Sequence, residues 1–240
     1  MYNLYLILFK RKDSTVKHDI NLKKFNVKDT NYFIHDIEND FISYEDVDLA
    51  FNYLEVNNLS DKDLVVFLDE KAITSQTNDQ LSSILEEIEE KLYYYDIFYL
   101  ANFMDNCSNF HEIESRLKNI KFHESYSPNG FYCNVTNYKK WKKISNILSK
   151  KNFLSISERL SESVLSKEIK AATVWPRVFV PDIESFSNQY ENFLTYPCRY
   201  ENIIIEDKKD KKNLSSYWFL KGIFIGIVFL IIYYNLVKFY

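Results

Sequence analysis

The chain has 240 residues, of which 46% are hydrophobic, and its formal net charge is −4. So much apolar material supports a sizeable core and excludes wholesale disorder. The acidic balance argues against the basic groove of a nucleic-acid-binding protein, so no nucleic-acid partner is expected. Three cysteines do not suggest a disulfide framework, and three glycines are few for a loop that cradles phosphate with its backbone.

Short apolar runs alternate with helical patterns over the first 180 residues. The opening run is followed, not preceded, by its basic residues at 10–12, so we expect a strand there and not a signal peptide. In chain order the pattern predicts a strand at 3–9, a helix at 44–56, a strand at 63–68, a helix at 82–93, strands at 96–101 and 130–136, helices at 139–148 and 158–169, and a strand at 173–180. This alternation predicts an α/β fold with a mainly parallel sheet. Pro176 predicts that the last strand lies at an edge of the sheet.

The C-terminal region predicts a membrane anchor. Residues 218–237 form an apolar run of about the length that a helix needs to cross a bilayer, roughly 20 residues. Four lysines lie between 208 and 212 and only Lys238 follows, which predicts that the N-terminal part faces the cytosol. We therefore expect one domain at 1–205, a charged tether at 206–217 and a single transmembrane helix at 218–237. The alternative for this last segment is a buried core helix.

Acidic residues follow two of the predicted strands. Asp69 and Glu70 come directly after the apolar run 64–68, and Asp105 comes soon after the run 96–101. In an open α/β sheet, ligands bind beyond the carboxyl ends of the strands. Carboxylates in that position are suitable ligands for a divalent cation that holds a diphosphate. The alternative is that these acids are ordinary helix caps or loop residues.

The order of these segments resembles glycosyltransferase family 25, which includes lipopolysaccharide-type transferases and relatives encoded by large DNA viruses. The resemblance rests on the run 64–73, the helix 81–92 and the segment 95–107, followed by similar segments at 130–148 and 157–181. It covers roughly residues 60–185. It implies a GT-A fold, which is a Rossmann-type sheet that binds a nucleotide-sugar donor through an acidic motif and usually Mn²⁺ or Mg²⁺.

The resemblance also implies a set of site residues. Asp69 and Glu70 would bind the metal, and together with Asp105 they would bind the donor. The family's motif is Glu-Asp-Asp, and here either Leu68 or Lys71 replaces one of its acids. Glu158 falls where an acid of the family acts as base on the acceptor hydroxyl. Its alternative role is that of a helix N-terminal acid, favoured by the helix macrodipole.

The sequence is compatible with two functions. The first is a membrane-anchored glycosyltransferase of the hexosyltransferase type, which transfers a sugar from a nucleotide-sugar to an unknown acceptor. The alternative is a catalytically inactive glycosyltransferase-like membrane protein, such as a viral one, that serves as a structural or interaction module. For an active site, Asp69→Asn is expected to abolish metal-dependent nucleotide binding and to leave the melting temperature nearly unchanged.

Overall fold

The structure is a computed structural model of the chain, and it describes residues 3–12, 30–56, 59–74, 76–101, 105, 111–153, 155–175 and 178–181. The chain divides into two units, 1–193 and 194–240, and every described residue belongs to the first. The predicted tether and anchor, 206–217 and 218–237, lie outside the described residues. Within the described part, no helix is long and apolar enough to span a bilayer.

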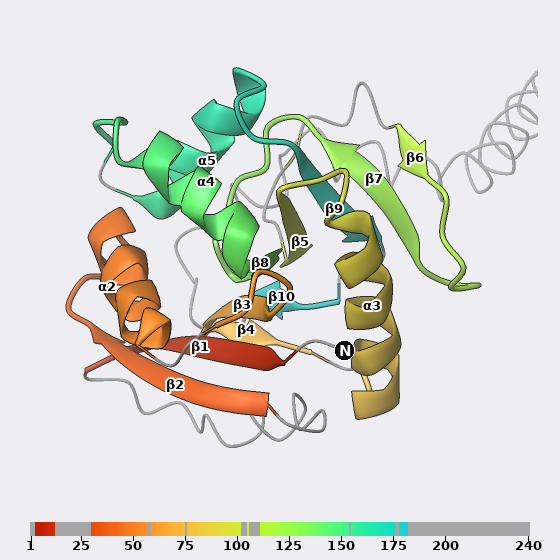
Figure 1. Cartoon of the computed structure of the whole chain (residues 1–240), viewed down its shortest axis with the longest axis horizontal. Coiled ribbons are helices and arrows are strands. Elements are labelled where there is room, and N and C mark those ends of the chain that lie inside the picture. The colour runs from red at the N-terminus through yellow and green to blue at the C-terminus, as the bar shows by residue number, and fades with distance from the viewer. Residues whose placement is uncertain are drawn as a thin grey trace, which may run out of the picture. The chain divides into compact units, whose positions relative to one another are not determined.

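The described strands form one large sheet and one small one (Figure 1). The large sheet has the order β2-β1-β3-β8-β5-β9-β7-β6, and β4 pairs with β10 in the small one. The strands are β1 (Leu4–Arg11), β2 (Thr30–Ile37), β3 (Leu64–Asp69), β4 (Ala72–Ile73), β5 (Ile97–Ala101), β6 (Glu112–Ile113), β7 (Lys121–Ser125), β8 (Cys133–Asn137), β9 (Ala171–Trp175) and β10 (Val180–Pro181).

The large sheet is mixed, which corrects the prediction of a mainly parallel one. The pairs β1–β2, β1–β3 and β5–β9 are parallel, whereas β8 runs antiparallel to both of its neighbours, β3 and β5. The strands β7 and β6 add further antiparallel pairs. An apolar run shows that a strand is buried on both faces, but it does not show the strand's direction. The α/β class is confirmed, and β3 and β5 still run in the same direction.

The prediction of an edge strand around Pro176 was wrong. The strand β9 ends at Trp175, one residue before the proline, and it lies between β5 and β7.

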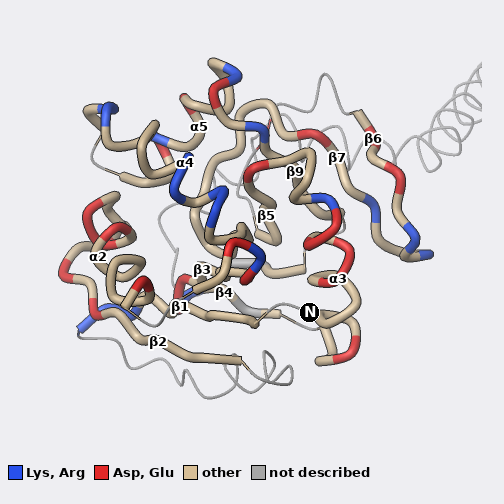
Figure 2. The backbone as a smooth tube through the Cα atoms, in the orientation of Figure 1, with Lys and Arg blue, Asp and Glu red and all other residues tan. Residues whose placement is uncertain are grey.

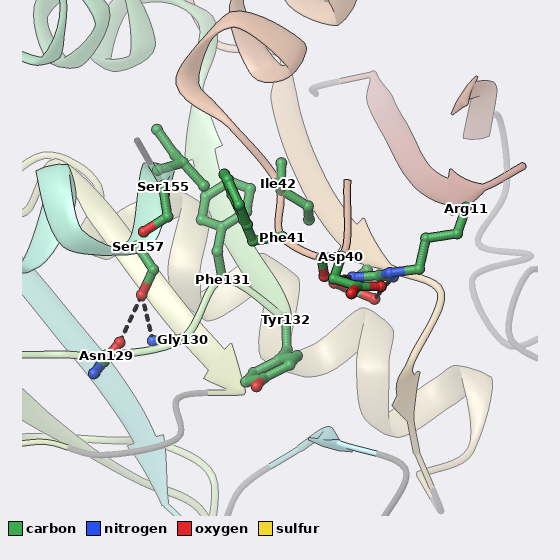
Figure 3. Close-up of a pocket in the computed structure, with 12 residues that line it drawn as sticks. Arg11, Asp40, Phe41, Ile42, Asn129, Gly130, Phe131, Tyr132, Ser155 and Ser157 are labelled. Atoms are coloured by element: carbon green, nitrogen blue, oxygen red, sulfur yellow. Dashed lines mark hydrogen bonds and ion pairs between the residues drawn. The ribbon is translucent and has the colours of Figure 1, made fainter. Parts of the chain in front are cut away.

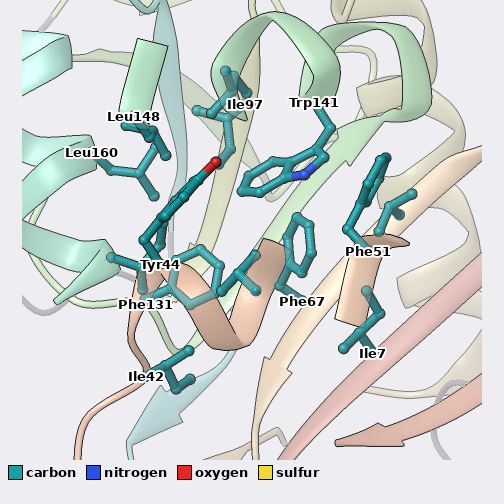
Figure 4. Close-up of a cluster of buried hydrophobic side chains, with 14 of the residues drawn as sticks. Ile7, Ile42, Tyr44, Phe51, Phe67, Ile97, Phe131, Trp141, Leu148 and Leu160 are labelled. Atoms are coloured by element: carbon teal, nitrogen blue, oxygen red, sulfur yellow. The ribbon is translucent and has the colours of Figure 1, made fainter. Parts of the chain in front are cut away.

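Helices cover both faces of the large sheet. The helices α2 (Tyr44–Glu55), α4 (Tyr138–Leu148) and α5 (Ile156–Leu165) pack on one face, and α3 (Asn78–Lys91) packs on the other (Figure 1). Alternate side chains of β3 point to the two faces, so that Phe67 packs with Trp141 of α4 and Leu68 packs in the cluster under α3. Figure 4 shows the aromatic cluster under α2, α4 and α5. This two-sided burial explains why the central strands are continuously apolar.

Two helix N-termini meet at one end of the sheet. Helices α2 and α5 begin with capping boxes, Ser43 with Asp46 and Ser155 with Glu158. The capping residues Ser43 and Ser155 form an antiparallel backbone bridge. The bridge therefore places the first turns of α2 and α5 side by side.

Candidate functional site

A pocket of about 210 Å³ lies at the carboxyl ends of β1 and β3 (Figure 3). Its walls come from the ends of these two strands, from the segment before α2, from the segment before β8 and from the first turn of α5. The lining residues are Arg11, Asp40, Phe41, Ile42, Asp69, Asn129, Gly130, Phe131, Tyr132, Ser155, Ile156 and Ser157.

Arg11 and the acidic pair form an ion cluster on one wall of this pocket. The guanidinium donates to both oxygens of Asp69, with Nη1–Oδ1 at 2.8 Å and Nη2–Oδ2 at 3.0 Å, and Nη1 lies 3.2 Å from Oε1 of Glu70. The exposed fraction of the side chain is 14% for Arg11, 5% for Asp69 and 1% for Glu70. A bidentate pair this well buried is a specific interaction and not a chance surface contact.

The backbone holds this cluster in place. The Arg11 N–H donates to Oε1 of Glu70 at 3.0 Å, and the Lys71 N–H donates to Oδ1 of Asp69 at 2.8 Å. Nη2 of Arg11 also donates to the carbonyl oxygen of Asp40 at 2.8 Å. Burial opposes the charged form of Arg11, but the hydrogen bonds and charges of Asp69 and Glu70 outweigh it and raise the pKa of the guanidinium. Arg11 is therefore a permanent cation in this site.

The residues here do not fit the divalent cation that the family resemblance implies. Arg11 already contacts both carboxylate oxygens of Asp69 and one of Glu70. The Lys71 backbone also presents its N–H to Asp69, and an N–H group, unlike an oxygen, cannot be a ligand for a cation. Among the described residues, no group of three or more His, Cys, Asp or Glu side chains could hold a metal ion. A cation such as Mn²⁺ needs several oxygen ligands that are free to turn towards it.

The opposite wall of the pocket is built around the start of α5. The Ser157 hydroxyl accepts a hydrogen bond from the Gly130 N–H at 2.7 Å and donates one to Oδ1 of Asn129 at 2.8 Å (Figure 3). Gly130 has a φ of 98°, which a residue with a Cβ adopts only with strain. These contacts fix the turn 129–130 against the helix, so this wall is preorganised.

Tyr132 forms the part of the pocket next to Asp69. Its carbonyl oxygen accepts a hydrogen bond from the Asp69 N–H at 2.8 Å, which ties the turn before β8 to the end of β3. Burial, together with the negative charge of Asp69, raises the pKa of the Tyr132 phenol to about 12. The phenol is therefore protonated at neutral pH and able to donate a hydrogen bond.

The other two predicted site residues are engaged elsewhere. Asp105 accepts hydrogen bonds from the Ser125 hydroxyl and from the N–H groups of Tyr126 and Ser127, at the end of β7, and it does not line the pocket. The carboxylate of Glu158 accepts a hydrogen bond from the Ser155 hydroxyl at 2.9 Å and so completes the capping box of α5. The structure thus brings together Asp69 and Glu70 but gives Asp105 and Glu158 partners outside this acidic cluster.

Sequence reasoning missed Arg11, the residue that dominates the acidic wall. A signal for it was available, because Arg11 ends the strand β1 and Asp69 ends its parallel neighbour β3. Residues at the ends of neighbouring parallel strands meet at one edge of a sheet. The walls at 40–42 and 129–132 have no comparable signal, since the loops that form them are placed by tertiary contacts.

No family model matches the sequence, and no curated protein matches it. Among solved structures, the chain is similar to the nucleoside-diphosphate-sugar pyrophosphorylase from Vibrio cholerae, with 12% sequence identity and a TM-score of 0.37. That likeness covers 79% of this chain and 80% of the other. A likeness of this size gives no ground for assigning a family or an activity, so the resemblance to glycosyltransferase family 25 stays a prediction.

Proposed function

We propose that the described domain is a GT-A-like glycosyltransferase domain that binds a nucleotide-sugar in the pocket at the carboxyl ends of β1 and β3. The observation that carries the proposal is the position of this pocket, because open α/β sheets bind their ligands beyond the carboxyl ends of their strands. The sequence also predicted that the acidic motif at Asp69 lies at this edge of the sheet.

The chemistry of the walls supports a ligand with a sugar and phosphate groups. Aromatic side chains at Phe131 and Tyr132 offer apolar area, and the side-chain amide of Asn129, which the Ser157 hydroxyl holds in place, offers hydrogen bonds to hydroxyls. The first turn of α5 also lines the pocket, and the N-terminus of a helix favours a phosphate group. The pocket is small for a whole nucleotide-sugar, so part of the donor would extend beyond it.

A thermal-shift screen of the full chain tests this proposal. The panel contains nucleotide-sugars, the matching nucleoside diphosphates and the free sugars, each in buffer with EDTA and with Mn²⁺. At a ligand concentration about a hundred times Kd, specific binding raises Tm by roughly 5 °C. We expect such a shift from at least one nucleotide-sugar. A panel in which no compound shifts Tm would contradict the proposal.

One observation favours the second candidate, an inactive interaction module. The acids expected to act on donor and acceptor are both bound to neighbours, Asp69 to Arg11 and Glu158 to Ser155. An assay for release of nucleoside diphosphate from the donor, with and without added saccharide acceptors, separates the candidates. Turnover supports the transferase, whereas binding without turnover supports the inactive module.

We also propose that residues 218–237 anchor the chain in a membrane, with the N-terminal domain in the cytosol. The support is the apolar length of this segment and the lysines that precede it. The test is a chain that ends at Ser216. It should leave the membrane fraction and keep a cooperative melt, and aggregation with loss of that melt would instead indicate a core helix.

A further inference from the structure

We infer that Arg11 takes the place that a divalent cation would have beside Asp69 and Glu70, so that the pocket binds its ligand without a metal ion. This inference rests on the proposed function for the identity of the ligand, but its physical basis is independent of that ligand. That physical basis is the set of contacts that the Arg11 side chain makes, and the sequence analysis did not consider this residue.

The shape of the Arg11 side chain fits the acidic pair. The planar guanidinium fork of Arg11 matches the two oxygens of Asp69 and reaches Oε1 of Glu70 as well. A metal ion would have to approach the same oxygens that Arg11 now contacts. A metal ion and Arg11 therefore compete for one position.

Arg11 is also held in this position by its backbone and by a second acceptor. Its strand β1 pairs in parallel register with β3, with Phe9 opposite Asp69, and its own backbone N–H is bonded to Glu70. Its Nη2 is held from the other side by the carbonyl oxygen of Asp40. Because the guanidinium keeps its charge at any ordinary pH, a divalent ion bound nearby would meet a buried positive charge.

The consequence concerns how the ligand is held. With Arg11 paired to the carboxylates, phosphate groups of a ligand have no metal to bridge them to Asp69. Recognition would come from the opposite wall, formed by Asn129, Ser157 and the first turn of α5. The affinity of the pocket is then the same in Mn²⁺ and in EDTA.

The test measures Mn²⁺ binding to the full chain by the loss of the electron paramagnetic resonance signal of the free ion. Three variants are compared with the wild type: Asp69→Asn, Arg11→Ala, and the control Arg116→Ala, which removes an exposed arginine paired with Glu90. We expect that wild type, Asp69→Asn and Arg116→Ala bind the same amount of Mn²⁺. Arg11→Ala should bind one ion more, and Mn²⁺ should restore part of its lowered Tm.

Two results would overturn the inference. One is a stoichiometric Mn²⁺ site in the wild type that is lost in Asp69→Asn. The other is a folded Arg11→Ala variant that gains no Mn²⁺. If Arg11→Ala does not fold, the comparison of wild type with Asp69→Asn decides alone. A parallel titration with nucleotide-sugars in EDTA and in Mn²⁺ separates the proposal of nucleotide-sugar binding from the inference about Arg11. Absence of binding in both buffers would contradict nucleotide-sugar binding, but it would not change the result of the Mn²⁺ measurement.

Discussion

Arg11 and Asp69 end two neighbouring parallel strands, and their side chains meet in a bidentate ion pair with distances of 2.8 Å and 3.0 Å. This relationship changes the role of the acidic motif. The sequence suggested a carboxylate facing an open site, whereas the structure shows a carboxylate bound to a cation of its own chain. Asp69 therefore has a structural partner whatever else the pocket binds.

The expected effect of Asp69→Asn on stability changes accordingly. Asp69→Asn removes the bidentate charged acceptor of Arg11 and leaves the guanidinium with Glu70 as its one charged partner among the described residues. The variant should therefore lose about 2 kcal/mol of unfolding free energy, where a purely functional acid would lose almost none. The matched control is Asp40→Asn, an exposed acid of the same pocket whose carbonyl, and not its carboxylate, contacts Arg11. Urea denaturation of both variants measures the difference, and equal stability of the two would show that the Arg11 pair contributes little.

Two variants of Glu158 distinguish a role as a helix cap from a role as the catalytic base. Glutamine also completes a capping box, so Glu158→Gln should keep the stability of α5, whereas Glu158→Ala should lose about 1 kcal/mol. If Glu158 acts only as a cap, Glu158→Gln turns over donor as fast as the wild type. A fold-intact Glu158→Gln that binds donor but releases no nucleoside diphosphate would assign the base to Glu158.

Periodicity was sufficient to predict the main helices and the central strands. The amphipathic pattern predicted 44–56 and 139–148, and these became α2 and α4 with boundaries that differ by one residue. The strands β2 and β7 escaped prediction because they carry polar, partly exposed residues in place of a continuous apolar run. The antiparallel direction of β8 could not be predicted for a different reason. The direction of the strand is fixed by its pairing with β3 and β5 and not by its own residues.

Asp96 predicts a specific loss of stability in acid. It is buried at the start of β5 and contacts Lys143 and Lys140 of α4, a helix rich in basic residues (Figure 2), and it accepts a hydrogen bond from the Lys170 N–H. Burial raises its pKa, but the hydrogen bonds and the lysine charges outweigh burial and hold the pKa below 3.8. Because the folded pKa lies below the unfolded one, this contribution is present above pH 3.8 and is lost as the pH falls through the folded pKa.

Asp96→Asn should therefore cost about 2 kcal/mol at pH 7, and the difference from the wild type should shrink as the pH falls below 3.8. Urea denaturation at low ionic strength across this pH range measures the difference in unfolding free energy. Glu112→Gln is the control, because its partner Lys121 and Glu112 itself are exposed, and it should change stability little at any pH. A pH-independent difference for Asp96→Asn would contradict the ion-pair explanation.

Asn134 is a polar residue in the middle of the hydrophobic core. Its side chain is 0% exposed, it lies between Phe67 and Tyr99 on the neighbouring strands, and neither of its amide atoms has a hydrogen-bond partner among the described residues. A buried unsatisfied amide costs stability. Asn134→Leu, which is similar in shape, should therefore raise the unfolding free energy by about 1 kcal/mol.

The matched control is Thr136→Val on the same strand. The Thr136 hydroxyl donates to the carbonyl oxygen of Asp96 at 2.8 Å, so its removal should lower stability by about 1 kcal/mol. Opposite signs for the two variants in thermal denaturation would support the assignment. Destabilisation by Asn134→Leu would indicate that an ordered water or another group satisfies the amide.

The candidate site was predictable only in outline. The position of Asp69 at the end of a buried strand predicted the correct edge of the sheet, because the carboxyl ends of strands are a general place for ligands. The partners of each acid were not predictable. Asp105 and Arg11 find theirs through segments that are distant in sequence, and no local pattern contains that information.

The proposed ligand site can be tested by calorimetric titration of the full chain with the nucleotide-sugar selected by the screen. Wild type is compared with Asn129→Ala and Asn119→Ala. Asn129 lines the pocket at the end of β3, whereas Asn119 lines a separate pocket of about 400 Å³ beside α3. We expect saturable binding to wild type, unchanged affinity in Asn119→Ala, and Kd increased roughly tenfold in Asn129→Ala through loss of hydrogen bonds. Absence of binding to well-folded wild type, or equal affinity in Asn129→Ala, would contradict the proposed site.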